Sequence, residues 1–343
     1  NTMNAQMLSC QYVDLAYHAG TEDAELTFVR IPFGRDTVNN HFQLKYRLDS
    51  VRNRIRIDLR AFLPLYLESA NLVNSYKSGG ADSRYFCNGF QSWTTSREYL
   101  SNERIRKLSP LLKAYSWHAG DYFIAGPKRK KGQLHSWSWA YWRNGNSYCA
   151  LASLGELSGF TAFRFNTIKE ELVLDKICKG YLVLADKSYS LFDFIYQEVD
   201  GYKGYQEFMN EYAALWHQRY NTSTPKAEAA QGWTSWYHYY DKIDEGIIEK
   251  NLNAFDEQGL NIDIFQIDDG YQAAIGDWLT PNKKFPNGMA SVASKIHEKG
   301  YKAGLWLAPF IVGKNSAIYK AHPDWIVRKS NGKPLKIAKN VIW

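Results

Sequence analysis

The stretch Asp263-Ile264-Phe265-Gln266-Ile267-Asp268-Asp269-Gly270-Tyr271-Gln272 decides how the second half of the chain is interpreted. Its first half is a short apolar run bounded by polar residues, which predicts a buried strand. The strand ends in two adjacent carboxylates followed by a glycine. Binding sites in α/β folds lie at the carboxyl ends of strands, so Asp268 and Asp269 form a candidate site. A solvated turn is the alternative interpretation, because Asp-Gly pairs are common in turns.

The segments on both sides of this stretch alternate between strand and helix patterns. Strands are predicted at 232–237, 262–268 and 303–309, with helices at 244–258 and 288–298. This order predicts parallel strands joined by right-handed crossovers, as in a doubly wound sheet or a (β/α)8 TIM barrel. No Gly-x-Gly-x-x-Gly follows a strand, which argues against dinucleotide binding. The polar and aromatic residues at the strand ends favour the barrel.

The first part of the chain has a different pattern. Short alternating runs separated by Gly, Asn and Asp predict an antiparallel β-sandwich domain over residues 1–189. Apolar residues at three- and four-residue steps then predict a helical linker over 190–226, and 227–343 is the first part of the barrel. The predicted fold class is therefore multi-domain, with a β-sandwich followed by an α/β region.

Charge, cysteine content and hydropathy limit which classes of binding partner are expected. The chain has 343 residues with a formal net charge of +7, but its basic residues are dispersed and the densest cluster, 128–132, resembles a hairpin turn. We therefore expect no nucleic-acid partner. The four cysteines form no CxxC pair, which indicates neither zinc nor a disulfide framework. No apolar run reaches the ~20 residues of a membrane span and no signal peptide opens the chain, so no membrane association and a cytoplasmic location are expected.

Aromatic residues accompany the carboxylates at the predicted strand ends. Trp236-Tyr237-His238 follows the first strand and Trp306 lies in the third. Carboxylates accept paired hydrogen bonds from neighbouring hydroxyls, and aromatic faces cover the C–H patches of a sugar ring. For Trp236 or Trp306 alone, packing inside the barrel is an equally good interpretation. Their combination with the Asp pair favours a sugar site.

Several motifs in this region occur in the order and spacing of a known family. They are Gly232-Trp233-x-Ser235-Trp236-Tyr237-x-Tyr239, Phe265-Gln266-Ile267-Asp268-Asp269-Gly270-Tyr271, Gly276-Asp277-Trp278, Phe285-Pro286-x-Gly288, Gly304-Leu305-Trp306-x-Ala308-Pro309-Phe310 and His322-Pro323-Asp324-Trp325. Together they resemble the catalytic barrel of glycoside hydrolase family 36 α-galactosidases, in the clan that also holds family 27. The β-rich region resembles that family's sandwich domain more loosely, with Asn88-Gly89-Phe90-Gln91-Ser92-Trp93 matching a Gln-Ser-Trp loop.

The resemblance implies a retaining α-galactosidase that releases terminal α-linked galactose from oligosaccharides without a cofactor. Asp268 and Asp269 would bind the galactose hydroxyls around C4 and C6 and so select the axial C4 epimer. The remaining implied binding residues are the pocket walls Trp306, Tyr237 and Trp236, the rim candidates Asp277 and Trp278, and Trp93, which would close the pocket from the sandwich domain. His238 is either a hydrogen-bond donor or a structural histidine. Members of the family often self-associate, so a homo-oligomer is a further expectation.

The catalytic pair itself is not found. Retention needs two carboxyl groups ~5–5.5 Å apart on opposite faces of the scissile bond, whereas Asp268 and Asp269 are neighbours in one backbone environment. In the family, the nucleophile is an Asp on the fourth barrel strand in a Lys-x-Asp context, and the acid/base is an Asp on the sixth. Neither precedes Trp343, so we expect a barrel truncated after about three strands, a fragment of a longer enzyme, and no hydrolysis by this chain alone.

Two other functions stay open at this point. One is a transglycosylase of the raffinose-synthase type, which would share the galactose subsite and transfer the sugar to an acceptor. The other is a non-catalytic carbohydrate-binding protein on the same scaffold. A related α-N-acetylgalactosaminidase is disfavoured.

Overall fold

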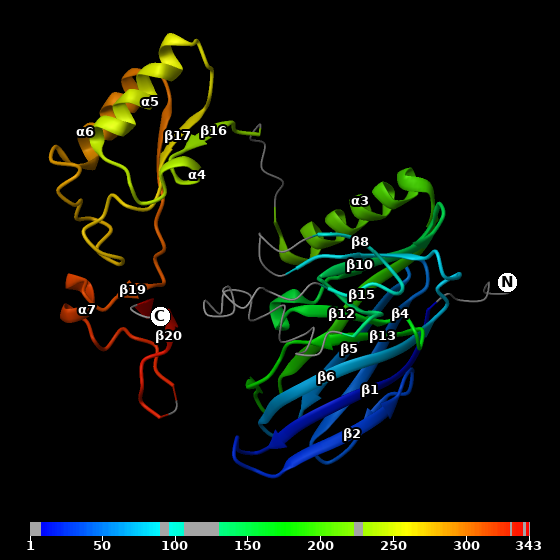
Figure 1. Ribbon diagram of the computed structural model, residues 1–343. Coiled ribbons are helices and arrows are strands. Elements are labelled where there is room, and N and C mark those ends of the chain that lie inside the picture. The colour runs from blue at the N-terminus through cyan, green and yellow to red at the C-terminus, as the bar shows by residue number, and fades with distance from the viewer. Residues whose placement is uncertain are drawn as a thin grey trace. The chain divides into compact units, whose positions relative to one another are not determined.

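The computed structural model describes residues 8–89, 96–105, 130–222, 229–329, 331–338 and 341–342 (Figure 1). The described residues up to 222 belong to one compact unit, and those from 229 onward belong to a second. In the described part of the chain, no helix is long and apolar enough to cross a membrane. The same residues contain no group of three or more His, Cys, Asp or Glu side chains that could hold a metal ion.

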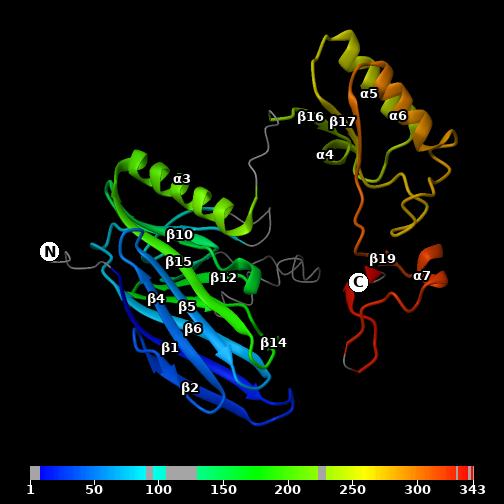
Figure 2. The ribbon, with the colours of Figure 1, turned by 180° about the vertical axis from the view of Figure 1, so that it is seen from behind.

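The first unit consists of two antiparallel sheets (Figures 1 and 2). One sheet has the order β2-β1-β6-β13-β12-β9, with β14 also pairing with β6, and the other has the order β3-β4-β5-β15-β11-β10-β7-β8. The strand bounds in the first sheet are β1 Leu8–Ala19, β2 Leu26–Pro32, β6 Leu65–Tyr76, β9 Gln133–Trp137, β12 Thr161–Asn166, β13 Glu171–Lys176 and β14 Tyr181–Val183. Those in the second are β3 Thr37–Val38, β4 Phe42–Asp49, β5 Arg54–Ala61, β7 Arg84–Cys87, β8 Arg97–Leu100, β10 Trp139–Asn144, β11 Ser147–Ser153 and β15 Ser188–Asp200.

Alternating side chains from both sheets fill one hydrophobic core. Leu72 on β6 and Phe163 on β12 are fully buried together with Leu59 on β5 and Leu151 on β11. Aromatic rings also join the sheets, since Trp142 on β10 lies 4.7 Å, between ring centroids, from a ring at the end of β6. This packing confirms the predicted antiparallel, sandwich-like part of the fold. A short 3-10 helix, η1 (Glu156–Ser158), precedes β12.

The helix predicted from residue 190 begins eleven residues later, so the prediction is wrong for 190–200. These residues form most of β15, which lies between β5 and β11, and α3 (Gly201–Tyr220) follows. The apolar residues of 191–195 are buried on both sides of the strand, because Leu191, Phe192 and Phe194 lie in the core between the sheets and Ile195 lies under α3. A doubly covered strand has the continuous apolar pattern of a buried helix, and periodicity alone does not separate the two.

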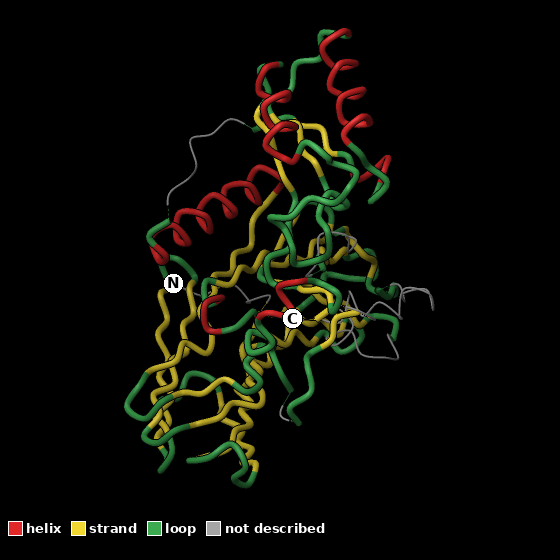
Figure 3. The backbone as a smooth tube through the Cα atoms, turned by 90° about the vertical axis from the view of Figure 1, so that its left-hand side faces the viewer, coloured by secondary structure: helices red, strands yellow, loops and turns green. Residues whose placement is uncertain are grey.

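Helix α3 packs along the outer face of the second sheet. Phe208 and Leu215 of α3 are buried against Ala150 and Ala152 of β11 and Ile195 of β15. Figure 3 shows α3 in red alongside the yellow strands. The segment predicted as a linker therefore contributes its helix to the first unit.

The second unit contains a three-stranded parallel sheet in the order β16-β17-β18. The elements of this unit are β16 Gly232–Thr234, α4 Trp236–Tyr239, α5 Glu245–Glu257, β17 Ile264–Ile267, α6 Gly288–Glu298, β18 Lys302–Leu305, β19 Val312–Gly313, α7 Ala317–Ala321, β20 Lys336–Ala338 and β21 Val341–Ile342. The last three strands form a small antiparallel sheet in the order β19-β21-β20. The predicted parallel strands and both predicted helices are confirmed.

The two longer helices are held on the parallel sheet by a compact apolar core. Phe265 and Ile267 of β17 are buried against Ile248 and Leu252 of α5 and against α6, which supplies Val292 and Ile296. Lys295 of α6 donates at 2.9 Å to Glu245 at the start of α5, and this bond lowers the pKa of Glu245. The packing fixes the direction of β17 and hence the position of the residues that follow it.

Two predicted strands are shorter than expected. β16 ends at Thr234, and residues 236 and 237 lie in α4 instead of a strand. β18 ends at Leu305, so 306–309 leave the sheet. Both strands stop where their pairing with the four-residue β17 stops, since Thr234 pairs with Gln266 and Leu305 pairs with Ile267. Aromatic residues favour strands, so the sequence predicts longer strands here. This preference has no effect where no neighbouring strand remains to pair with.

Candidate functional site

The candidate site lies at the carboxyl edge of the parallel sheet. Ser235 follows β16, Asp268 and Asp269 follow β17, and Trp306 follows β18. The register brings these ends together, because the Trp306 amide donates to Ile267 O at 2.9 Å and the Asp268 amide donates to Ser235 Oγ at 2.9 Å. Parallel strands thus deliver the polar and aromatic residues of three separate segments to one edge.

Asp268 is 9% exposed and receives several hydrogen bonds. Its Oδ2 accepts from Thr234 Oγ1 at 3.0 Å and from Gln266 Nε2 at 3.1 Å. Its Oδ1 accepts from the Asp269 amide at 2.8 Å. Among the residues that the structure describes, no lysine or arginine forms an ion pair with this carboxylate. Neutral donors therefore replace water around a buried negative charge.

Asp269 is half-buried and has one carboxylate oxygen bound within the protein. Its Oδ1 accepts from Gln272 Nε2 at 2.6 Å. Its Oδ2 has no hydrogen-bond partner in the described part of the chain. An ionised carboxylate accepts up to about four hydrogen bonds, so the pair keeps unused acceptor capacity at the edge of the sheet. Ligand hydroxyl groups match that capacity.

Gly270 allows the chain to turn directly after the pair. Its φ of +114° is unfavourable for residues with a side chain, and a Cβ at this position would lie 2.7 Å from Asp241 O. Asn282 then secures the turn, because its Nδ2 donates to Gly270 O at 2.8 Å and to Gln272 O at 3.1 Å. The strand therefore ends at the carboxylate pair, and hydrogen bonds hold the turn that follows.

Tyr271 is buried beside the pair. It is 0% exposed and packs in the core of the second unit, and its hydroxyl has no hydrogen-bond partner among the described residues. Burial, together with the nearby charge of Asp269, raises the pKa of Tyr271. The side chain therefore stays neutral and serves as an aromatic support beneath the site.

Two of the predicted aromatic residues lie together at the third strand end. The rings of Trp278 and Trp306 meet edge to face with centroids 5.7 Å apart. Trp278 comes from the loop after β17, and it also packs against the core of the unit. An edge-to-face pair holds both indoles in place, which suits the wall of a binding site.

The other predicted site residues have different surroundings. Trp236 contacts the ring of Tyr240 at 5.4 Å, and Tyr237 is 85% exposed. Both carboxylate oxygens of Asp277 accept hydrogen bonds from the start of α7. The Ala317 amide donates at 2.9 Å and the Ile318 amide at 3.1 Å. Trp93, the predicted contribution of the sandwich domain, lies outside the described residues.

Sequence reasoning missed the side chains that hold the pair. Gln266 was detectable, because residues two apart on a strand share a face and Gln266 precedes Asp268 by two. Thr234 follows from the parallel register, in which it lies opposite Gln266. Gln272 carries no such signal, since its contact depends on the geometry of the Gly270 turn.

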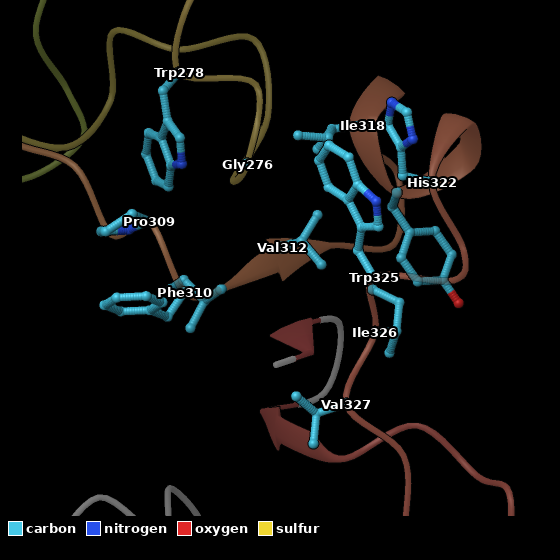
Figure 4. A pocket seen from close by; sticks show the side chains of 12 residues that line it. Gly276, Trp278, Pro309, Phe310, Val312, Ile318, His322, Trp325, Ile326 and Val327 are labelled. Carbon is cyan, nitrogen blue, oxygen red and sulfur yellow. The ribbon is translucent and has the colours of Figure 1, made fainter.

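An apolar cavity of about 310 Å³ lies farther along the same unit (Figure 4). Trp278 borders it, and the segment after β18, helix α7 and the segment around Trp325 form the rest of the lining. The lining residues are Gly276, Trp278, Pro309, Phe310, Ile311, Val312, Ile318, Tyr319, His322, Trp325, Ile326 and Val327. In Figure 4 the Trp278 indole stands at the side of the cavity opposite His322 and Trp325.

Comparison with known proteins identifies relatives of this region. The Melibiase family model matches residues 201–342. Alpha-galactosidase Mel36A of Lactobacillus acidophilus is 38% identical over 82 residues, which are 22% of this chain and 11% of that protein. Alpha-galactosidase AgaA of Geobacillus stearothermophilus is 33% identical over 100 residues, which are 27% of this chain and 13% of that protein.

Solved structures show the same fold over most of the chain. TtGalA, an α-galactosidase from Thermus thermophilus in complex with stachyose, superposes with a TM-score of 0.60 at 23% identity and covers 90% of this chain. The GH36 α-galactosidase AgaA from Geobacillus stearothermophilus gives a TM-score of 0.53 at 16% identity and covers 99% of this chain.

The chain spans only part of these relatives, namely 60% of the TtGalA chain and 51% of the AgaA chain. The relatives and solved neighbours given above are named as α-galactosidases, which are glycoside hydrolases. The family model and the local identities show that residues 201–342 are similar to α-galactosidases, and the chain shares its fold with a solved GH36 α-galactosidase.

Proposed function

We propose that this chain supplies the galactose-binding part of a retaining α-galactosidase acting on terminal α-linked galactose of oligosaccharides. The observation that carries the proposal is the Asp268–Asp269 pair at the carboxyl edge of the parallel sheet, with a carboxylate oxygen of Asp269 left without a partner among the residues that the structure describes. Relatives named as α-galactosidases, one of them in complex with stachyose, support this substrate class.

In this proposal the two carboxylates accept hydrogen bonds from the hydroxyls around C4 and C6 of galactose. Asp268 is fixed by Thr234 and Gln266, so it offers a rigid acceptor instead of a mobile one. A preorganised acceptor favours one epimer, because the axial and equatorial C4 hydroxyls lie in different directions. Trp306 covers an apolar face of the sugar, with Trp278 behind it.

The remaining predicted residues have secondary places in the proposal. Trp236 and Tyr237, in α4, form a further wall. Asp277 acts at the rim by holding the start of α7. We also propose a cytoplasmic location and self-association of the protein.

The bond-breaking carboxyl groups are assigned to other barrel strands. A retaining mechanism places a nucleophile and an acid/base on opposite faces of the scissile bond, ~5–5.5 Å apart. Asp268 and Asp269 are instead joined by a hydrogen bond from the amide of one to the carboxylate of the other, in a single network. We propose that β16, β17 and β18 are the first three strands of a (β/α)8 barrel, and that the catalytic pair belongs to later strands.

Saturation-transfer NMR on the purified 343-residue chain tests this function. The C4 epimers galactose and glucose are compared as ligands, for the wild-type chain and for Asp268→Ala and Asp269→Ala. We expect saturation of galactose but much less of glucose, and loss of the galactose signal in both variants. Asp256→Ala is the matched control, because this exposed aspartate pairs with Lys299 on the helices.

Two outcomes contradict the proposal. Equal saturation of galactose and glucose would contradict the proposal that Asp268 and Asp269 recognise the axial C4 hydroxyl. Robust turnover of nitrophenyl α-galactoside by the 343-residue chain removes the assignment of the catalytic pair to other strands.

A further inference from the structure

Gln272 connects the two ends of the turn that carries the carboxylate pair. It is 8% exposed, and its side-chain amide makes two hydrogen bonds of opposite polarity. Nε2 donates to Asp269 Oδ1 at 2.6 Å, and Oε1 accepts from the Gly270 amide at 3.1 Å. Both groups of the amide are thus used within three residues of the chain, which leaves the side chain a single orientation.

The backbone of Gln272 is also held on both sides. Its carbonyl accepts from Asn282 Nδ2 at 3.1 Å, and it forms an isolated bridge with Pro281. The next amide, of Ala273, donates to Thr280 O at 2.8 Å. The side chain of Gln272 therefore extends from a fixed point, and its contact with Asp269 does not depend on a flexible loop.

This arrangement determines which way the Asp269 carboxylate faces. A carboxylate can rotate about its terminal bond, since that torsion is broad and has no deep staggered minima. The bond from Gln272 fixes Oδ1 and with it the position of Oδ2, which has no partner among the described residues. A charge-assisted bond of this length is strong enough to maintain one orientation.

We propose that Gln272 is a positioning residue that sets the preference of the site for galactose over glucose. It touches no sugar and acts through Asp269. An Asp269 carboxylate free to rotate would follow either C4 hydroxyl, whereas a fixed one discriminates between the axial and equatorial positions. The inference rests on the proposed galactose site, and it adds a residue that neither contacts the ligand nor carries charge.

Two substitutions change the amide in different ways. Gln272→Asn keeps the polarity but shortens the side chain by one methylene, so it cannot reach both Asp269 and the Gly270 amide. Gln272→Glu keeps the length but replaces the donor by a second carboxylate facing Asp269. Lowering the pH protonates the introduced group and restores an O–H donor. Gln258→Glu is the matched control, because Gln258 is exposed at the end of α5 in the same unit.

The experiment measures galactose and glucose affinities by NMR titration for these proteins at pH 8 and pH 5, each relative to the wild-type chain at the same pH. We expect Gln272→Asn to weaken galactose binding about tenfold, the scale of one hydrogen bond to a charged group, with little change for glucose. Gln272→Glu should be weaker still at pH 8 and recover toward the wild type at pH 5. Gln258→Glu should match the wild type at both pH values.

The outcomes separate the two claims. A wild-type chain that prefers galactose, with the same preference in Gln272→Asn and no pH-dependent recovery in Gln272→Glu, overturns the role of Gln272 alone. A wild-type chain without any preference overturns the galactose site and this inference together. Thermal melting shows whether each variant is folded, and the recovery of Gln272→Glu at low pH is a signature that general loss of structure does not produce.

Discussion

Lys176 at the end of β13 is a buried cation of the sandwich unit. It is 1% exposed, and burial lowers its pKa from 10.5 to about 8, although Glu156 and Asp193 nearby act in the opposite direction. Asp193 is itself fully buried and already bound by Arg54 and Arg219, at 2.8 Å and 3.0 Å. Lys176 therefore carries a buried positive charge that its neighbours compensate only in part.

The sign of the resulting pH dependence follows from the direction of the shift. Below pH 8 the folded and unfolded chains both carry the proton, and the cost of burying the ammonium is present in full. Between about pH 8 and 10.5 the folded chain loses the proton first, so the unfolded chain binds more protons and the unfolding free energy rises with pH. The difference between a pKa of 10.5 and one of about 8 corresponds to about 3 kcal/mol.

Lys176→Met isolates this effect. Lys176 Nζ donates to Gly155 O at 2.5 Å, and the Ser158 amide donates to the same carbonyl at 3.4 Å, so the acceptor keeps a partner in the variant. Buried thiols such as Cys87, whose pKa is raised by burial, lower the stability of both proteins as the pH rises. The difference between wild type and variant removes that common contribution.

The assay is urea unfolding of both proteins at pH 7.5 and at several values up to pH 10.5. The unfolding free energy of the wild type minus that of Lys176→Met should rise by about 3 kcal/mol over this range. The control Lys203→Met, at a side chain that is 90% exposed, should differ from the wild type by a constant amount. A pH-independent difference for Lys176→Met would refute the reasoning.

Three further predictions concern the second unit, each measured by chemical unfolding. Gly270→Ala should destabilise it by about 2–3 kcal/mol or more and weaken galactose binding, because φ is +114° and the new Cβ would meet the Asp241 backbone; a change within error would contradict the rigid turn. Tyr271→Phe should stabilise the unit by about 1–3 kcal/mol, since it removes a buried hydroxyl without a partner in the described structure; clear destabilisation would show that the hydroxyl is bonded. Asp277→Ala should cost about 1 kcal/mol through loss of the cap on α7, and unaltered stability would contradict that role.

The sequence predicted the scaffold of the site well because its signals are local. The apolar run before Asp268 and the helix patterns at 244–258 and 288–298 correspond to β17, α5 and α6. The predicted start of α5 agrees with the structure, in which Asp244 caps the helix by accepting from the Ile247 amide at 2.7 Å. Such patterns depend on neighbours within one element.

The predictions from the sequence were wrong where contacts between distant elements determine the local structure. Residues 190–200 resembled a helix because α3 covers the outer face of β15, which the strand's own sequence does not reveal. Residues 236–237 left the strand because β17 offers no further pairing. The contact of Gln272 with Asp269 spans the Gly270 turn, and the contact of Asp277 with the start of α7 joins residues far apart in the sequence. None of these contacts produces a periodic pattern in the sequence.

The most direct test of the central claim is a chemical-shift map of galactose binding on the isotopically labelled chain. The claim predicts that the largest changes occur at the Asp269 and Gly270 amides and at the Trp306 indole, and that glucose at the same concentration leaves these signals in place. Changes confined to the cavity beside Trp325, or to the sandwich unit, would contradict the assignment of the sugar site to Asp268 and Asp269.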